Sequence, residues 1–310
     1  MKTSAVSPPD IRASVMAVPP LARHADLTLN PGANAALIRH IEAGGIRTLL
    51  YGGNANLYNT GLYEYASLLD MLAEQASEST WVIPSAGPDY GTLMDQAPVL
   101  KARHFPAVMA LPLAFAASPG GVARGLRLFA EAAGTPLLLY IKSEQYLTLD
   151  AIGALMDEGV ACAIKYAVPR EDPAQDAFLG ALLDRVGTER VVCGLAETPV
   201  LTHMREFGLP SFTSGGVCIA PTLSQGLLKT AQRQDWAAAE PLRDAFLPFE
   251  RQRERTGVFA TMHDAVTLAG IADMGPLQPM LENLPQSAHA AVRPIAEALL
   301  AAEQQARQKA

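Results

Sequence analysis

Lys165 is the residue of this sequence whose type and surroundings point most directly to chemistry. It stands in an apolar run, residues 160–167, that contains no other charge, and it is one of only six lysines in the chain. Desolvation lowers the pKa of a lysine, and a neutral amine is a nucleophile that can form a Schiff base with a carbonyl compound. Lys165 is therefore a candidate catalytic residue. The competing interpretation is a lysine that extends from a strand end into solvent.

A second reactive side chain, Tyr140, ends the apolar run that precedes the run of Lys165. If the two runs are adjacent parallel strands, both side chains lie at the same end of the sheet, where barrel enzymes place their active sites. A phenol can shuttle protons during imine formation and carbon–carbon bond cleavage. We expect Tyr140 to act with Lys165; the alternative is a core tyrosine whose hydroxyl is satisfied.

Two glycines, Gly52 and Gly53, directly follow the run that ends at Tyr51, and Asn54 comes next. Glycines allow backbone amides to approach a ligand closely, and such a turn can bind a carboxylate. A plain turn is the competing interpretation, so these residues indicate a binding site only in combination with Lys165 and Tyr140.

The composition is that of an ordinary globular chain, with 49% hydrophobic and 18% charged residues and a net charge of −7. The mild acidity and the lack of basic runs argue against nucleic acid as a partner. No apolar run approaches the ~20 residues of a membrane span, and the first ten residues do not resemble a signal peptide. Cys162, Cys193 and Cys218 lie in apolar runs without metal-ligand spacing, which indicates core positions in a cytoplasmic protein.

Short apolar runs alternate with longer amphipathic stretches as far as about residue 220. This alternation predicts parallel strands with helices outside, and eight such units over roughly 200–230 residues predict a (β/α)8 barrel. A doubly wound open sheet is the alternative, although no G-x-G-x-x-G follows the first strand. The predicted strands are residues 13–18, 46–51, 81–85, 107–111, 136–141, 160–165, 190–194 and 211–213, and the predicted helices between them are residues 34–43, 63–76, 120–133, 149–157 and 173–186.

After Pro221 the pattern is helical only, with helices predicted over residues 222–232, 236–255, 259–269 and 289–306. We therefore divide the chain into a catalytic barrel, residues 1–225, and a C-terminal helical segment, residues 226–310. The polar turns after Glu303 are expected to fray.

Several motifs resemble the dihydrodipicolinate synthase/N-acetylneuraminate lyase family of class I Schiff-base enzymes, from Val15 to about Pro279. Leu139-Tyr140 is similar to the family's L-Y-N, and Ala163-Ile164-Lys165 is similar to its G-I-K. The run from Ser214 to Pro221 resembles S-G-x-A-N-x-x-P, Val18-Pro19-Pro20 resembles the opening V-x-T-P, and Cys193-Gly194 resembles the end of the seventh strand. The resemblance implies a barrel with C-terminal helices that assembles as a homo-oligomer, a tetramer or dimer, with Lys165 as the Schiff-base lysine and Tyr140 as the proton-transfer residue.

The departures from the family pattern concern the substrate. The family's G-T-T-G-E turn is here residues 52–56, which lack the hydroxyls that hold a pyruvate carboxylate, although Asn54 can still donate an amide hydrogen bond. The usual Tyr-Tyr after the fourth strand is replaced by residues 113–115. The Asn-x-Pro-x-Arg expected after Tyr140 is replaced by residues 141–145, so the arginine that recognises a second carboxylate is missing. Dihydrodipicolinate synthase activity itself is therefore not expected.

The sequence predicts a Schiff-base lyase, an aldolase or hydro-lyase, for a small-molecule substrate: pyruvate or a 3-deoxy-2-oxo sugar acid. The imine serves as the electron sink, so neither a metal nor an organic cofactor is needed. Lys165 and Tyr140 are the predicted catalytic residues. The predicted substrate-binding residues are Gly52, Gly53, Asn54, Lys142, Gln145, Gly194, Glu197, Thr213 and Ser214.

Three alternatives accompany this prediction. Glu197 is either an acid/base group at the barrel mouth or a solvated or paired carboxylate. The lost hydroxyls and arginine favour a homologue that binds a small carboxylate without turnover. The turn of Ser214, Gly215 and Gly216 resembles the phosphate cup of other barrels and would suit an aldolase for phosphorylated sugar acids.

Overall fold

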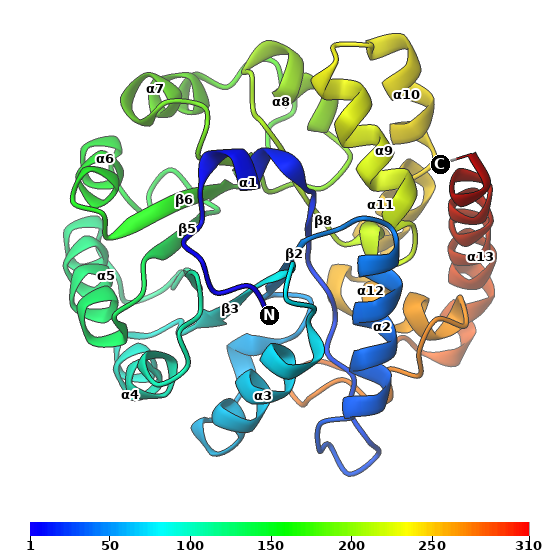
Figure 1. The fold of residues 1–310 in the computed structure, drawn as a ribbon, viewed down its shortest axis with the longest axis horizontal. Coiled ribbons are helices and arrows are strands. Elements are labelled where there is room, and N and C mark those ends of the chain that lie inside the picture. Colours follow the sequence, from blue (N-terminus) through cyan, green and yellow to red (C-terminus); the bar gives the residue numbers. More distant parts are fainter. Residues whose placement is uncertain (310) are drawn as a thin grey trace.

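The computed structural model describes residues 1–309. Eight parallel strands form one sheet in the order β7-β6-β5-β4-β3-β2-β1-β8. A further parallel bridge joins Cys193 of β7 to Phe212, directly before β8. The sheet thus closes on itself, with helices around it (Figure 1). The predicted (β/α)8 barrel is confirmed, and the open sheet is wrong.

All eight predicted strands are present, and nearly every strand residue is buried. Helices cover the outside of the sheet and side chains fill its inside, which is why these strands are continuously apolar in sequence. Their bounds are β1 (Met16–Ala17), β2 (Thr48–Tyr51), β3 (Trp81–Ala86), β4 (Val108–Ala110), β5 (Leu137–Ile141), β6 (Ala161–Tyr166), β7 (Val191–Cys193) and β8 (Thr213–Ser214).

The five helices predicted between the strands are confirmed, and three others were missed. One of these, α4, contains Pro98 and begins at the N-cap Asp89, whose carboxylate accepts from the amide of Thr92; the other two are short. The helices of the barrel are α1 (Pro8–Ala13), α2 (Pro31–Ala43), α3 (Leu62–Gln75), α4 (Tyr90–Lys101), α5 (Pro119–Ala133), α6 (Leu149–Asp157), α7 (Ala177–Val186) and α8 (Val200–Glu206), with the short 3₁₀ helices η1 (Leu57–Asn59) and η2 (Gly216–Cys218).

The C-terminal helices are α9 (Pro221–Gln232), α10 (Trp236–Asp244), α11 (Leu247–Thr256), α12 (Val258–Leu268) and α13 (Gln286–Lys309). The single helix predicted over residues 236–255 is wrong, because the chain breaks between α10 and α11 and Pro248 occupies the first turn of α11, where a missing N–H costs nothing. The polar turns from Glu303 onward, which we expected to fray, continue α13 as far as Lys309, and Ala310 lies outside the described residues. Glu303 is buried and accepts from the amide of Leu223 at 3.0 Å. No helix of residues 1–309 has the length and hydropathy to span a bilayer.

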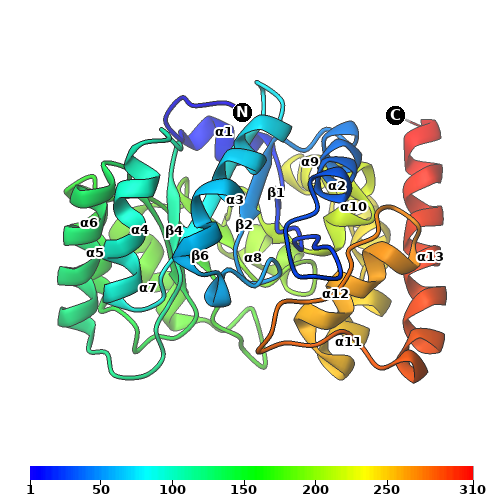
Figure 2. The ribbon, with the colours of Figure 1, turned by 90° about the horizontal axis from the view of Figure 1, so that it is seen from below.

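Different segments cover the two ends of the barrel (Figure 2). At the amino ends of the strands lies α1, and the amide of Lys2 donates to the carbonyl of Thr80, next to the start of β3. Helices α11 and α12 lie at the opposite end. The carboxyl ends of the strands are therefore the end at which helices from beyond the barrel can contribute to a site.

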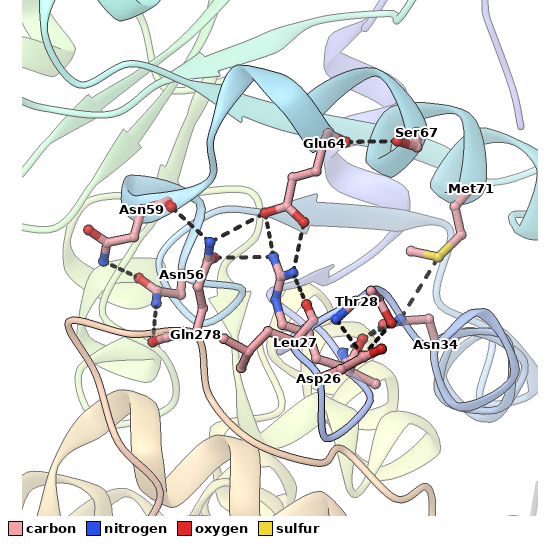
Figure 3. Close-up of polar contacts among 12 residues, drawn as sticks. Asp26, Leu27, Thr28, Asn34, Asn56, Asn59, Glu64, Ser67, Met71 and Gln278 are labelled. Atoms are coloured by element: carbon pink, nitrogen blue, oxygen red, sulfur yellow. Dashed lines mark hydrogen bonds and ion pairs between the residues drawn. The ribbon is translucent and has the colours of Figure 1, made fainter.

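A buried polar network fastens the loop after β2 to the connector between α12 and α13 (Figure 3). Arg23 donates to both carboxylate oxygens of Glu64, at 2.8 and 2.9 Å, and to Gln278 at 3.1 Å. The amide of Gln278 donates to the carbonyl of Asn59 at 2.9 Å, and Asn56 donates to the carbonyl of Gln278 at 3.2 Å. Because each buried charge has several partners, the network fixes the chain that follows Gly52 and Gly53.

Candidate functional site

Lys165 and Tyr140 are register partners in β6 and β5, so their side chains emerge next to each other. The Nζ atom of Lys165 lies 4.3 Å from the centre of the Tyr140 ring. The following residue, Tyr166, points the other way and donates its hydroxyl to Asp176 at 2.6 Å. This alternation directs Lys165 into the barrel, as the sequence predicted.

The amine of Lys165 is held in a setting that disfavours its charge. The residue is 5% exposed, and no carboxylate of residues 1–309 forms an ion pair with it. Burial, with the positive charges of Lys142 and Arg253, lowers the pKa of Lys165 to about 7. A large fraction of the amine is therefore neutral near pH 7, and the interpretation of a solvated lysine is wrong. Burial also raises the pKa of Tyr140, which keeps its proton on the phenol.

A cavity of about 410 Å³ lies over these two side chains at the carboxyl ends of the strands. It is large enough for a small organic acid. Among residues 1–309 no three potential ligands converge to hold a metal ion. Of the predicted residues, those that line the cavity are Gly53, Asn54, Tyr140, Lys142, Lys165, Gly194 and Thr213.

Two glycines at the site are required by close packing. A Cβ on Gly194 would lie 2.9 Å from Cγ of Lys165 and 2.7 Å from the carbonyl oxygen of Tyr166, so glycine leaves room for the lysine stem. A Cβ on Gly52 would lie 2.6 Å from Cε of Met109. Gly52 does not line the cavity; its place in the structure is explained by packing.

The side chain of Asn54 is partly committed to the protein. Its amide donates to the carbonyl of Val18 at 2.7 Å, and its oxygen accepts from Nη2 of Arg253 at 3.4 Å. Asn54 therefore ties the loop after β2 to β1 and to α11, and one amide hydrogen remains for a ligand.

Glu197 and Ser214, both predicted to contact substrate, lie beneath the cavity lining. Glu197 is fully buried and accepts from the hydroxyl of Ser214 at 2.5 Å, and its second oxygen has no partner. Burial and the nearby charge of Glu250 raise the pKa of Glu197 to about 8, against the opposing effects of Ser214 and Arg253. Glu197 is therefore not solvated, but its bond with Ser214 agrees with the expectation of a paired group. Ser214 also accepts from the amide of Val217, so the pair holds the turn after β8.

Gln145 lies apart from Lys165, on the wall of a neighbouring cavity. Its side-chain oxygen accepts from the hydroxyl of Ser143 at 2.5 Å, and its backbone amide donates back to that hydroxyl at 3.2 Å. Lys142 lines both cavities.

Arg253, which the sequence did not single out, enters the site from α11. It is 6% exposed, lines the cavity, and donates through Nη1 to both oxygens of Glu250 at 2.9 Å. A Cβ on Gly215 would lie 3.0 Å from Nη1, so glycine there admits the guanidinium. In sequence, Glu250 and Arg253 are three residues apart on a polar helix, which is typical of a surface ion pair. No local signal distinguishes this buried pair from an exposed one.

No protein-family model matches the sequence, and no curated protein matches it significantly. Solved structures do match. Dihydrodipicolinate synthase from Bacillus clausii has a TM-score of 0.82 and 19% identity, covering 94% of this chain and 98% of that chain. Sialic acid aldolase from Ruminococcus gnavus has a TM-score of 0.83 and 13% identity, covering 95% and 99%. A prophage protein of the dihydrodipicolinic acid synthase family from E. coli K12, in complex with pyruvate, has a TM-score of 0.80 and 18% identity, covering 92% and 98%.

This chain shares their fold. At these identities the similarity concerns the fold, so the argument for an activity depends on the side chains of the cavity.

Lys142→Met should raise the pKa of Lys165, because it removes one of the positive charges that disfavour the ammonium form. The pH dependence of reductive methylation at Lys165, followed by mass spectrometry, should have its midpoint near pH 7 in the wild type and at higher pH in the variant. Lys101→Met, on the distant α4, should leave the midpoint unchanged. Equal midpoints in the Lys142 variant and the wild type would refute this account of the pKa.

The Glu197→Gln variant should gain stability relative to the wild type as the pH rises. The folded state holds the proton of Glu197 up to about pH 8, whereas the unfolded chain loses it near pH 4.5. The wild type therefore loses up to about 1.4 kcal/mol of stability per pH unit within this window, and the amide does not. Melting temperatures between pH 5 and 8.5 should diverge in favour of the variant. The exposed control Glu189→Gln should stay parallel to the wild type, and parallel curves for both variants would contradict the buried acid.

Proposed function

We propose that this chain is a member of the dihydrodipicolinate synthase/N-acetylneuraminate lyase family and a Schiff-base lyase for pyruvate or a longer 2-oxo acid. The observation that carries the proposal is the buried amine of Lys165, with its pKa lowered to about 7, beside Tyr140 at the carboxyl ends of barrel strands. A neutral, desolvated amine at this place is a nucleophile for a keto carbon. The prophage protein of the same fold, solved with pyruvate, supports this ligand class. A cytoplasmic homo-oligomer, implied by the resemblance, belongs to the same proposal.

In this mechanism Nζ of Lys165 attacks C2 of the 2-oxo acid and forms a carbinolamine. Tyr140 donates its proton to the departing hydroxyl, which leaves as water, and the protonated imine then draws electrons from C3. Cleavage of the C3–C4 bond begins from this intermediate, and so does dehydration, in which C3 loses a proton and the C4 hydroxyl then leaves as water. Hydrolysis of the imine by water returns the free lysine.

We assign Arg253 to the C1 carboxylate, together with Gly53 and the remaining amide hydrogen of Asn54. Nη1 of Arg253 is held by Glu250, while Nη2 makes only the 3.4 Å contact with Asn54. The guanidinium is thus fixed in orientation and retains donors for an anionic ligand. Arg253 would supply the carboxylate contact that the family's threonine hydroxyls supply elsewhere.

The alternative functions are less well supported. A phosphate at the turn after β8 would lie close to the carboxyl of Glu197, with which Ser214 already bonds. A binding protein without turnover would have no use for an amine whose burial costs stability, so the lowered pKa of Lys165 favours the lyase.

Borohydride reduction in the presence of pyruvate should attach a reduced pyruvyl group to Lys165, because reduction traps the imine. Peptide mass spectrometry should locate the adduct there in the wild type and in the exposed control Lys229→Met, and Lys165→Arg should abolish it. If Lys165 stays unmodified across a panel of 2-oxo acids, the proposed function is wrong. If the adduct forms but no longer 2-oxo acid is turned over, the alternative of a binding homologue without catalysis is correct.

The double variant Glu250→Gln, Arg253→Met replaces the buried ion pair by a neutral pair. It should raise the half-saturating pyruvate concentration for trapping by about 10- to 100-fold, because the carboxylate loses one charge-assisted hydrogen bond. The double variant avoids leaving Glu250 buried and unpaired. Trapping is measured at pH 9, where the amine is neutral, so that the effect of Arg253 on Lys165 does not enter. Arg251→Met, exposed on the same helix, should retain the wild-type value; an unchanged value in the double variant would remove Arg253 from the carboxylate site.

A further inference from the structure

A second cavity, of about 620 Å³, adjoins the one over Lys165. Lys142 and Phe259 line both cavities. Because the two spaces share these side chains, they lie next to each other, with Lys165 on the wall of the first and the loops after β4 and β5 around the second. A substrate whose keto carbon reaches Lys165 can therefore extend past Lys142 and Phe259 into the second cavity.

The wall of the second cavity is mainly apolar and aromatic, and no acidic side chain lines it. Its larger members are Tyr58, Pro112, Leu113, Val122, Tyr146 and Phe259. Tyr58 and Tyr146 are partly buried, and burial raises the pKa of both phenols, so neither offers a charge.

Two of the polar side chains of this wall are bonded within the protein, while Lys142 stands at the border with the first cavity. Ser143 donates to Gln145, and Ser118 caps α5 by accepting from the amide of Gly121 at 3.4 Å. A chain of sugar hydroxyls would lie against a wall that is mainly apolar, and each hydroxyl that lost water there without gaining a partner would cost free energy. An apolar group would gain free energy from burial, and a flat ring can pack against the three aromatic side chains.

We propose that the second cavity is the subsite for the distal part of the substrate, and that this part is an apolar group, best matched by an aryl ring. This inference depends on the proposed function and narrows its substrate class from 2-oxo acids in general to 4-hydroxy-2-oxo acids with an apolar substituent on C4. It departs from the sugar acid that the sequence suggested.

In the corresponding cleavage the substrate is bound to Lys165 as an imine through C2. The C3–C4 bond breaks and its electron pair enters the enamine. The C4 hydroxyl gives its proton to Tyr140, which lost its own during imine formation, and C4 becomes an aldehyde in the second cavity. C3 of the enamine takes up a proton, and water hydrolyses the imine to release pyruvate. Nothing is oxidised or reduced overall.

The test compares pyruvate release, coupled to lactate dehydrogenase, from a 4-aryl-4-hydroxy-2-oxobutanoate and from a six-carbon polyhydroxylated 3-deoxy-2-oxo acid. We expect kcat/KM to favour the aryl substrate by at least about 10-fold. Suppose that the protein forms the pyruvate imine at Lys165 but has equal kcat/KM for both substrates, or a higher kcat/KM for the sugar acid. This result would overturn the inference and leave the proposed function standing. Absence of that imine would overturn both.

Two variants locate the preference in the second cavity. Val122→Asp places a charge on its α5 wall, and Ala117→Asp places one on its exposed loop, where folding is not at risk. Both should lower the ratio of kcat/KM for the aryl substrate to that for the sugar acid by about 10-fold or more. Leu128→Asp, on the exposed side of α5, should preserve the ratio. An unchanged ratio in Ala117→Asp and Val122→Asp would show that the distal group lies elsewhere.

Discussion

Keeping an amine neutral inside a barrel is the constraint on which the rest of the site depends. A carboxylate beside Lys165 would stabilise the ammonium form and remove the nucleophile. The two buried acids near the site do not pair with the lysine: Glu250 is paired with Arg253, and burial raises the pKa of Glu197 to about 8. The cations Lys142 and Arg253 reinforce the effect of burial on the lysine. The same two cations make the space over Lys165 attractive to an organic anion.

The site joins two environments of opposite character. Next to Lys165 the lining includes two cations, an amide and glycine backbone, which suit the charged end of a 2-oxo acid. It also includes two acids, of which Glu250 is paired with Arg253 and Glu254 is exposed. Beyond Lys142 and Phe259 it becomes aromatic and aliphatic. A ligand that is polar at one end and apolar at the other satisfies both parts at once, and its orientation is then fixed by the order of the two environments along the cavity.

The sequence predicted the barrel well because strands buried on both faces are continuously apolar, and this pattern needs no knowledge of contacts. It also predicted the pairing of Lys165 with Tyr140, since the ends of adjacent strands must meet. It could not predict Arg253 or the burial of Glu197, because both depend on how α11 and the turn after β8 pack in space. The break between α10 and α11 was missed although the sequence marks it, because Pro248 would lie in the interior of a helix over residues 236–255 and would remove one of its hydrogen bonds.

The place of Arg253 in the chain has a consequence for biosynthesis. The ribosome completes all eight strands, with Tyr140 and Lys165, before it makes α11 and α12. Until α11 emerges and packs, the site lacks Arg253, one of the two cations that lower the pKa of Lys165. The lysine therefore reaches its full reactivity as a nucleophile only when the chain is almost finished.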